Sequence, residues 1–404
     1  MMQDNAVFSV IDAKKNKLKR NIINELYRSG PRTLSQLATI LHTSIPSVTA
    51  LVEELNIGQW THGVGTGAAQ FGRKPSLFAL DPSRYVTVVA DINRHDVKLI
   101  IFNLANQVIY RLDVDLHLDD SETFLSILRE PLEQIVREAE VRNLHVIGVG
   151  VALPGLIDPA RGLNYTYPHL NRPNHSLTDL LQELFNAPTY LLNDTKATIL
   201  GEHRFGLAKG KNHVLSINID WGIGLAAILN GELLQGASGF AGELGHIQIQ
   251  ESGQLCYCGK VGCLDTMASA YALIQRVKAG LLEGRVSKLA EEDFEKIDVE
   301  MVIDQANAGD AFAIDMLTEI GSELGRGLSI AVHLFNPERI IINGVLAKAD
   351  KLIRRPIEQA IDKYCLADYR NNLSIEISQL GEMAKLAGAH AFVMQSLLDQ
   401  EQIP

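Results

Sequence analysis

The sequence predicts a bilobal α/β protein preceded by a winged helix-turn-helix domain. Three helical segments are expected within the first 58 residues, a strand meander runs from residue 85 to 115, and a second strand-then-helix series begins at Val214. Two successive α/β lobes that each open with an antiparallel meander predict a bilobal fold with a cleft between the lobes. The 404 residues, of which 46% are hydrophobic, suffice for two or three domains with a substantial core.

The first two helices are marked by strong boundary signals. Apolar residues from Leu18 to Leu26 recur at helical spacing, and Gly30–Pro31 ends this helix. Thr33 and Gln36 have the spacing of a capping box, which predicts the start of the second helix.

A third helix is expected to begin near Ser44, with Pro46 in its first turn, where proline is tolerated. Its inward face is predicted to hold Ile45, Val48, Leu51, Val52 and Leu55. A tight connection between the second and third helices is typical of a helix-turn-helix unit.

After Trp60 the chain is glycine-rich and then alternates like a strand, which predicts a β-wing with Arg73 and Lys74 at its tip. The third helix would enter the major groove by its N-terminal turn, and the wing would reach the backbone or the minor groove. The predicted DNA-binding residues are Arg32, Ser44, Ser47, Thr49, Arg73 and Lys74. Residues 43–58 contain no Lys or Arg, so base recognition would depend on hydroxyl and apolar contacts; a head that docks a protein is the alternative.

The charge is unevenly distributed along the chain. Residues 1–80 contain nine Lys/Arg and five Asp/Glu, a balance of +4, which leaves −15 for the rest of a chain whose net charge is −11. This asymmetry is typical of a small DNA-binding head on an acidic body, although a solvated surface helix would also show it.

No apolar stretch approaches 18 residues and no signal peptide is evident, which predicts a soluble cytoplasmic protein without membrane insertion.

The body alternates strands and helices. The expected elements are a helix at about 121–142, a strand at 145–153, a helix at 176–186, a strand at 190–193, a helix at 195–205 and a long apolar-striped segment at 311–335. The last segment could supply core, interface, or both.

Three of the four cysteines lie close together. Cys256, Cys258 and Cys263 give the spacing C-x-C-x₄-C, and His246 precedes the first by ten residues. Three thiolates and one imidazole close a tetrahedral shell, so the set predicts a structural zinc ion rather than a catalytic one. The alternative is three buried thiols beside a core histidine. Gly259 and Gly262 favour a loop folded tightly around a metal.

The segments FAGELGHIQIQ (240–250) and CYCGKVGCLDTMAS (256–269) resemble the signature of the ROK family of repressors, open reading frames and sugar kinases. With the winged head, the whole chain resembles the NagC/Mlc/XylR-type repressor branch of that family. The resemblance implies an actin-like, ribonuclease H-like sugar-kinase fold. The implied domains are residues 1–82 for the head and 83–404 for the body. The body would have lobes at roughly 83–193 plus the C-terminal helix and at 194–383, with a zinc loop at 246–263.

The resemblance also implies a sugar site and the same four zinc ligands. The residues that match the family's sugar contacts are Asn193, Asp194, Glu243, His246 and Asp265. Carboxylates accept hydrogen bonds from hydroxyls, and His246 could bind zinc through one ring nitrogen and a sugar through the other. The family usually has Glu in the place of Asp265. For Asp194 the alternative role, which is compatible with sugar binding, is to cap the helix that begins near Thr195.

Both phosphate loops of the family's kinases are altered in this sequence. Where the kinases have Asp-x-Gly-Gly-Thr, residues 91–95 read DINRH, and where they have Gly-Thr-Gly, Asp220 and Trp221 precede Gly222. This predicts no catalytic residues and damaged nucleotide binding.

The sequence therefore favours a regulator, acting as a repressor of carbohydrate genes, which binds operator DNA and a sugar or sugar phosphate as a homodimer or homotetramer. An active sugar kinase with a fused DNA-binding head, and a repressor controlled by sequestration on a protein, are the alternatives.

Overall fold

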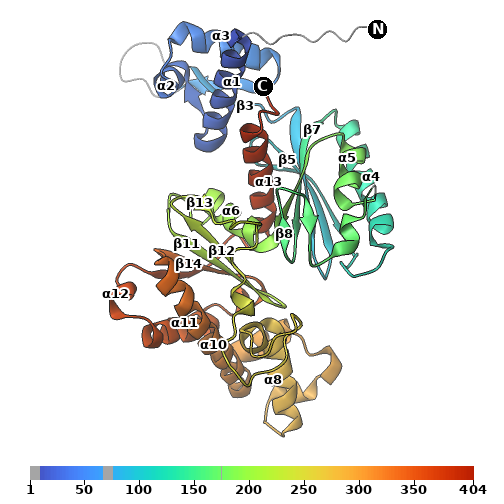
Figure 1. Cartoon of the computed structure of the whole chain (residues 1–404), viewed down its shortest axis with the longest axis vertical. Helices are drawn as coiled ribbons and strands as arrows, with labels where there is room; N and C mark the ends of the chain where they lie inside the picture. The colour runs from blue at the N-terminus through green and yellow to red at the C-terminus, as the bar shows by residue number, and fades with distance from the viewer. Residues whose placement is uncertain (1–9, 67–75, 174) are drawn as a thin grey trace. The chain divides into compact units, whose positions relative to one another are not determined.

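The computed structural model of the chain describes residues 10–66, 76–173 and 175–404 (Figure 1). They divide into two compact units. Unit 1 comprises Met1–Val151, Tyr167–Leu191 and His390–Pro404, and unit 2 comprises Ala152–Thr166 and Leu192–Ala389. Within the described ranges, none of the helices is both long and apolar enough to cross a membrane.

Unit 1 begins with the helices α1 (Val10–Ser29), α2 (Leu34–Ile40) and α3 (Ile45–Ile57). The strands β1 (Arg32–Thr33), β3 (Ser76–Leu80) and β2 (Thr61–Thr66) form a small sheet in that order. The capping box at the start of α2 is present, with the Thr33 side chain accepting from the Gln36 amide and the Gln36 side chain accepting from the Thr33 amide. This is the element order of a winged helix-turn-helix domain.

One expected core residue of the head is wrong. Val48, Leu51, Val52 and Leu55 of α3 are buried as predicted, but the Ile45 side chain is 51% exposed. Its helical spacing is right, yet Ile45 is the first residue of α3 and lies beyond the end of the core that the other four residues fill.

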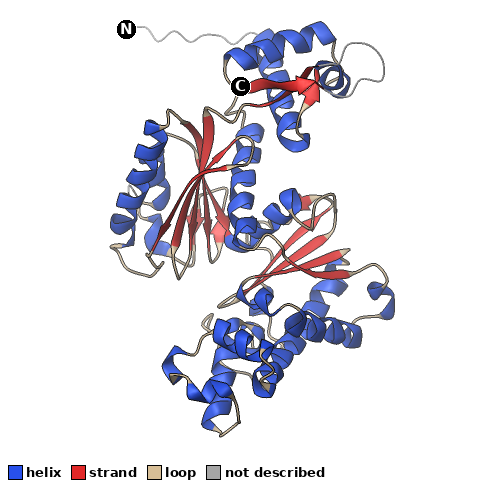
Figure 2. Cartoon of the chain, turned by 180° about the vertical axis from the view of Figure 1, so that it is seen from behind, coloured by secondary structure: helices blue, strands red, loops and turns tan. Residues whose placement is uncertain are grey.

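The α/β part of unit 1 is built on a sheet with the order β10-β7-β4-β5-β6. Its strands are β4 (Tyr85–Ile92), β5 (Val97–Asn103), β6 (Val108–Val114), β7 (His145–Leu153) and β10 (Thr189–Asn193). The helices α4 (Phe124–Val141) and α5 (Leu177–Phe185) cover one face, and the end of α13 (Glu382–Asp399) covers the other (Figure 2).

The core of the head continues into the α/β part of unit 1. Buried residues of the head and of α13, among them Leu55 and Leu397, belong to one apolar cluster. At the junction the Trp60 and Tyr85 rings stack with centroids 4.0 Å apart, and the Tyr85 hydroxyl donates to the Gly58 carbonyl. Within unit 1, the head is thus packed against the α/β part rather than joined to it only by a linker.

Unit 2 contains a second sheet with the order β13-β12-β11-β14-β15. Its strands are β11 (Val214–Ile219), β12 (Ile223–Leu229), β13 (Glu232–Leu233), β14 (Arg339–Asn343) and β15 (Ser374–Ile377). Numbered within their own sheets, the strands of both sheets follow the order 3-2-1-4-5, with an antiparallel meander beside added strands. This repeated topology is that of the predicted actin-like fold.

Alternation along the strands of unit 2 builds a core on each face of the sheet. Val214, Ala226 and Ile228 pack with α6 (Asp194–Phe205), whereas Leu215 and Ile217 face a larger cluster. That cluster includes residues of α8 (Ala270–Leu282), α9 (Val299–Asn307), α10 (Ala311–Phe335) and α11 (Lys351–Tyr364). The apolar stripe of residues 311–335 is therefore a core helix of unit 2.

The remaining elements of the described chain are short. They are the strands β8 (Ile157–Asp158) and β9 (Leu163–Asn164), the helices α7 (Asp265–Ala268) and α12 (Ala367–Arg370), and the 3₁₀ turns Pro168–Asn171, Leu244–His246, Lys288–Glu291, Phe294–Lys296 and Val345–Ala349.

Candidate functional site

The four predicted metal ligands come together in unit 2. His246 ends a 3₁₀ turn, while Cys256, Cys258 and Cys263 lie on the loop that follows. One ligand atom from each residue can be chosen so that all four atoms lie within 4.8 Å of one another. The loop turns back at Gly259 and Gly262, both with positive φ, and a Cβ at Gly262 would lie 1.6 Å from the Gln250 carbonyl oxygen.

The spacing of these atoms fits a tetrahedral zinc site. The Cys258 and Cys263 sulfurs lie 3.7 Å apart, and the Cys256 sulfur lies 3.7 Å from His246 Nδ1. Zn–S bonds of about 2.3 Å and Zn–N bonds of about 2.0 Å imply tetrahedral edges of about 3.5–3.8 Å. The donor set therefore fits zinc, with Nδ1 as the nitrogen of His246 that faces the metal position.

Burial makes two of these thiols hard to ionise without a metal. Desolvation raises the pKa of Cys263 to about 12 and also raises the pKa of Cys256. Since metals bind the thiolate, metal uptake at this cluster must release protons.

Three of the predicted sugar-binding residues lie at or beside the metal cluster, and one of them, His246, is also a metal ligand. Asp265 is the first residue of α7, two positions after Cys263, and is 6% exposed. Burial raises the pKa of its carboxyl group, while the hydrogen bond from the Ile223 amide and the charge of His246 act to lower that pKa. Desolvation also raises the pKa of Glu243, although this residue is exposed, and the nearby Asp265 charge adds to the effect. Glu243, His246 and Asp265 thus form one electrostatically coupled group, called here the acid–histidine cluster.

The other two predicted sugar residues lie at the start of α6, and one expectation about them is wrong. The N-cap is Asn193, not Asp194: the Asn193 Oδ1 accepts from the Thr195 and Lys196 amides at 3.0 and 3.1 Å. Its Nδ2 donates to the Gly155 carbonyl at 3.2 Å. Asp194 is instead the first helical residue, where its charge interacts favourably with the helix dipole.

Sequence reasoning missed two residues at this site. Lys196 is only 3% exposed; its ammonium donates to the Gly239 carbonyl, and it acts electrostatically on Glu243, which connects the first turn of α6 to the acid–histidine cluster. Tyr257 hydrogen-bonds to His246. Lys196 lies two residues after Asp194 and Tyr257 lies between two cysteines, but only long-range contacts reveal their roles.

The turn between β4 and β5, where the family's kinases have their first phosphate loop, is closed by its own side chains. Asn93 Oδ1 accepts from the His95 and Asp96 amides at 2.8 and 3.2 Å, and Asn93 Nδ2 donates to the Asp96 carboxylate at 2.6 Å. The Arg94 guanidinium donates to the Tyr167 hydroxyl at 2.9 Å. The Asn93, His95 and Asp96 amides of this turn are thus bonded within the turn itself.

The second such turn, between β11 and β12 in unit 2, is filled in a similar way. The Asp220 carboxylate accepts from the Val345 amide at 2.7 Å and from the Asn218 side-chain amide at 2.9 Å. Trp221 is 46% exposed, and its ring centroid lies 5.1 Å from that of Tyr271. A fixed carboxylate and an indole ring therefore occupy this turn.

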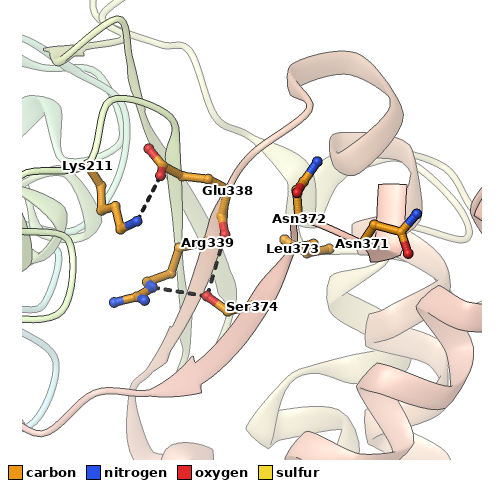
Figure 3. A pocket seen from close by; sticks show the side chains of 7 residues that line it. All are labelled: Lys211, Glu338, Arg339, Asn371, Asn372, Leu373 and Ser374. Atoms are coloured by element: carbon orange, nitrogen blue, oxygen red, sulfur yellow. Dashed lines mark hydrogen bonds and ion pairs between the residues drawn. The ribbon is translucent and has the colours of Figure 1, made fainter. Parts of the chain in front are cut away.

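A cavity of about 530 Å³ lies elsewhere in unit 2, beside Glu338 and Ser374 (Figure 3). Its charged groups are engaged with protein partners. Lys211 pairs with Glu338 at 3.0 Å, and Arg339 binds Ser374 and pairs with Glu376 at 3.0 Å. This polar cavity includes none of the predicted site residues.

The predicted DNA-contacting residues of the head are placed as follows. Ser44 caps α3 by accepting from the Ser47 amide at 3.3 Å, and the Thr49 hydroxyl donates to the Ile45 carbonyl at 2.9 Å. Arg32 is held by Glu25 through a bond of 2.9 Å. Arg73 and Lys74 lie outside the described residues.

Glu54 of α3 carries a negative charge that would repel DNA, but two lysines of α1 pair with it. Glu54 contacts the ammonium groups of Lys15 and Lys19 at 2.6 and 2.9 Å, and these hydrogen bonds lower its pKa. The carboxylate is therefore paired within the head.

Comparison with known proteins gives consistent matches over most of the chain. A family model described as "ROK family" matches residues 87–396. The chain is 29% identical over 370 residues to the N-acetylglucosamine repressor of Escherichia coli O6:H1, an alignment that covers 92% of this chain and 90% of the repressor.

Two solved structures are similar to this chain, one over nearly its whole length and the other over about three quarters of it. A ROK family transcriptional regulator described as a homologue of the E. coli MLC protein has a TM-score of 0.84 and 29% identity, and the match covers 97% of this chain and 98% of that one. The ROK family glucokinase from Streptomyces griseus, solved with glucose and AMPPNP, has a TM-score of 0.66 and 25% identity, covering 77% and 99%.

Proposed function

Because the chain belongs to the ROK family, we propose that it is a DNA-binding transcriptional regulator that represses carbohydrate uptake or breakdown genes in response to a sugar or sugar phosphate. One observation carries the proposal: the turns at which the family's kinases would hold phosphate are filled by the chain's own side chains. Occupancy of the site would then be signalled to DNA rather than converted to product.

The energetic argument against nucleotide binding rests on Asp220. A carboxylate about 4 Å from a phosphate oxygen costs about 4 kcal/mol at an effective dielectric constant of 20, nearly a thousandfold in affinity. The Val345 amide, already bonded to Asp220, offers no compensation. We infer that the protein is not an enzyme.

The sugar would be held by the acid–histidine cluster and by the first turn of α6. Carboxylates of Asp194 and Glu243 accept from sugar hydroxyls, and His246 Nε2 can donate to one. Asp194, the residue that resembles the kinases' general base, would serve here only as a hydrogen-bond acceptor. Asn193 and Asp265 would also fix the backbone around the sugar: Asn193 caps α6, and Oδ1 of Asp265 binds the Ile223 amide at 2.8 Å, which leaves its Oδ2 to accept from a sugar hydroxyl.

His246, Cys256, Cys258 and Cys263 would hold a structural zinc ion. Four protein ligands leave no open coordination position, so the ion would fix the loop geometry and not take part in a reaction. Because His246 belongs to both groups, a metal ion that fixes the loop would also fix the position of His246 in the acid–histidine cluster.

The head, residues 1–82, would bind operator DNA with the N-terminal turn of α3 in the major groove. A two-fold operator requires two heads, so we propose a homodimer or a higher oligomer. Sugar binding can change DNA affinity only to the extent that the sugar prefers one arrangement of the protein over another.

A gel-shift assay with DNA from the protein's own promoter region tests the proposal. We expect a specific complex that weakens with salt and that one sugar of a panel dissociates or strengthens. A thermal-shift panel of hexoses, amino sugars and their 6-phosphates identifies that sugar, because a ligand of the folded state raises Tm. Absence of any complex at low and moderate salt would refute DNA binding.

A sugar kinase with a fused head is the second candidate, favoured by the intact Asp194 at the start of α6. ADP formation from ATP and Mg²⁺ with a common hexose would establish it. A repressor controlled by a protein partner would instead bind its operator and ignore every sugar in the panel.

A further inference from the structure

Tyr257 lies between two metal ligands, and its phenol reaches the sugar site. The Tyr257 and His246 rings meet edge to face, with centroids 5.1 Å apart. The Tyr257 hydroxyl lies 3.0 Å from His246 Nε2, the ring nitrogen that faces away from the cysteines. Since Cys256 and Cys258 fix the backbone on both sides of Tyr257, this placement follows from the loop itself.

The Asp265 carboxyl group is close enough to the same hydroxyl for Tyr257 to lower the pKa of that acid, against the larger effect of burial. A phenol can donate one hydrogen bond and accept another, so it can donate to Asp265 while accepting from His246 Nε2–H. A sugar hydroxyl placed between these two groups would make the same pair of bonds.

We infer that Tyr257 is a specificity-determining residue whose hydroxyl takes the place of one ligand hydroxyl between His246 and Asp265. This inference rests on the proposed sugar site. A ligand with a free hydroxyl at that position must displace the phenol, so its two hydrogen bonds to His246 and Asp265 replace the two that the phenol makes. A ligand that lacks the hydroxyl, or carries a substituent there, leaves the phenol and its two hydrogen bonds in place and has no loss of affinity.

Displacement of the phenol is feasible because its burial is slight. Tyr257 is 72% exposed, so it can turn outward without opening the core. The hydroxyl exchange is then nearly neutral in the wild type, whereas a Tyr257→Phe protein lets the ligand hydroxyl gain bonds that no protein group contests. One net hydrogen bond of about 1 kcal/mol corresponds to about a fivefold gain in affinity.

The test compares zinc-loaded wild type, Tyr257→Phe and the control Tyr271→Phe, a second exposed tyrosine of unit 2. Calorimetry with N-acetylglucosamine, glucose and xylose selects the tightest sugar, and its monodeoxy derivatives are then measured on all three proteins. Zinc content, measured by mass spectrometry, should be one per chain in each protein. We expect one deoxy derivative to match its parent within about twofold on wild type and Tyr271→Phe, but to bind about fivefold more weakly than its parent on Tyr257→Phe.

Equal deoxy penalties on wild type and Tyr257→Phe would overturn the inference, because the phenol would not compete with any ligand hydroxyl. Weaker binding of every sugar by Tyr257→Phe would overturn it as well, since Tyr257 would then be a ligand contact. If no sugar binds any of the three zinc-loaded proteins, the proposed sugar site itself fails. That result differs from one in which sugars bind but the affinity differences between each sugar and its deoxy derivatives do not depend on Tyr257.

Discussion

At the scale of single residues, unit 2 depends on charged groups that join distant segments. The Glu338 carboxylate accepts from Lys211 at 3.0 Å and from the Asn212 and His213 amides at 2.8 and 3.2 Å, which ties β14 to the segment before β11. The Lys211 hydrogen bond, with help from these amides, lowers the pKa of Glu338 from 4.5 to about 2. This residue therefore makes stability depend on pH.

Glu338→Gln should destabilise unit 2 by about 1 kcal/mol at pH 7, since both partners are partly exposed and solvent screens the charge. Because the folded pKa is depressed, the stabilisation is complete above about pH 4.5 and is lost as the pH falls towards 2. Urea unfolding from pH 7 to 3 should show the gap between wild type and variant narrowing only below about pH 4.5. A gap that does not change with pH would contradict this account.

Cys263→Ser should release the metal, because it removes a buried ligand from a closed four-ligand set. We expect the zinc content to fall from one per chain to near zero and Tm to fall by about 5 °C or more. The control is Cys365→Ser, since Cys365 lies outside the metal cluster. If the two variants kept the same zinc content and Tm, the cluster would not be a metal site.

Residue roles were predicted well where a local pattern encodes them and poorly where they depend on distant contacts. The spacing of Cys256, Cys258 and Cys263 fixes a loop, so the metal cluster could be predicted from the sequence. Tyr257 and Lys196 escaped prediction because nothing in their neighbours shows that one meets His246 and the other Gly239.

At the scale of elements, α6 and α13 pack within unit 2 so closely that their backbones touch. An ideal Cβ at Gly388 of α13 would lie 1.8 Å from the Ala197 carbonyl oxygen, and one at Gly201 of α6 would lie 1.8 Å from the Ala384 carbonyl oxygen. Backbone atoms cannot move aside as a flexible side chain can, so glycine is required at both positions.

Gly388→Ala should therefore lower stability by about 2 kcal/mol, although alanine is the better helix former by about 1 kcal/mol. Calorimetric unfolding measures the change. Ser396→Ala on the same helix is the matched control and should alter stability by less than about 0.5 kcal/mol. A stabilising effect of Gly388→Ala would show that the two helices can move apart without loss.

Element boundaries followed the strength of the local signal. β7 (His145–Leu153) and α10 (Ala311–Phe335) begin and end where the sequence predicts, because a continuous apolar strand and a long apolar stripe leave little choice. The N-cap of α6 was misassigned because Asn193 and Asp194 are both good capping residues and only the backbone geometry distinguishes them. The outward position of Ile45 likewise depends on where the core of the head ends.

At the scale of the whole molecule, the proposed function requires the head to bind DNA through the start of α3. Ser47 is the third residue of that helix, where a glutamate would favour the helix by interacting with its dipole. The same charge would face the phosphate backbone. A substitution there can thus separate folding from DNA binding.

Ser47→Glu should leave Tm unchanged or slightly raised and weaken operator binding at least about tenfold. Thr318→Glu adds the same charge to an exposed position of α10 in unit 2 and should bind DNA like wild type. Gel shifts at two salt concentrations with both variants make the comparison. Equal binding by Ser47→Glu and wild type would place the DNA contact elsewhere.

The two altered turns occupy corresponding places in the repeated topology: each joins the first and second strands of its sheet. In each turn one side chain accepts a hydrogen bond from a backbone amide: Asn93 in the turn of unit 1 and Asp220 in the turn of unit 2. Under the proposed function, opening one of the two turns would therefore leave the other still filled by its own side chain. A single substitution at Asn93 or at Asp220 should then not be enough to give nucleotide binding.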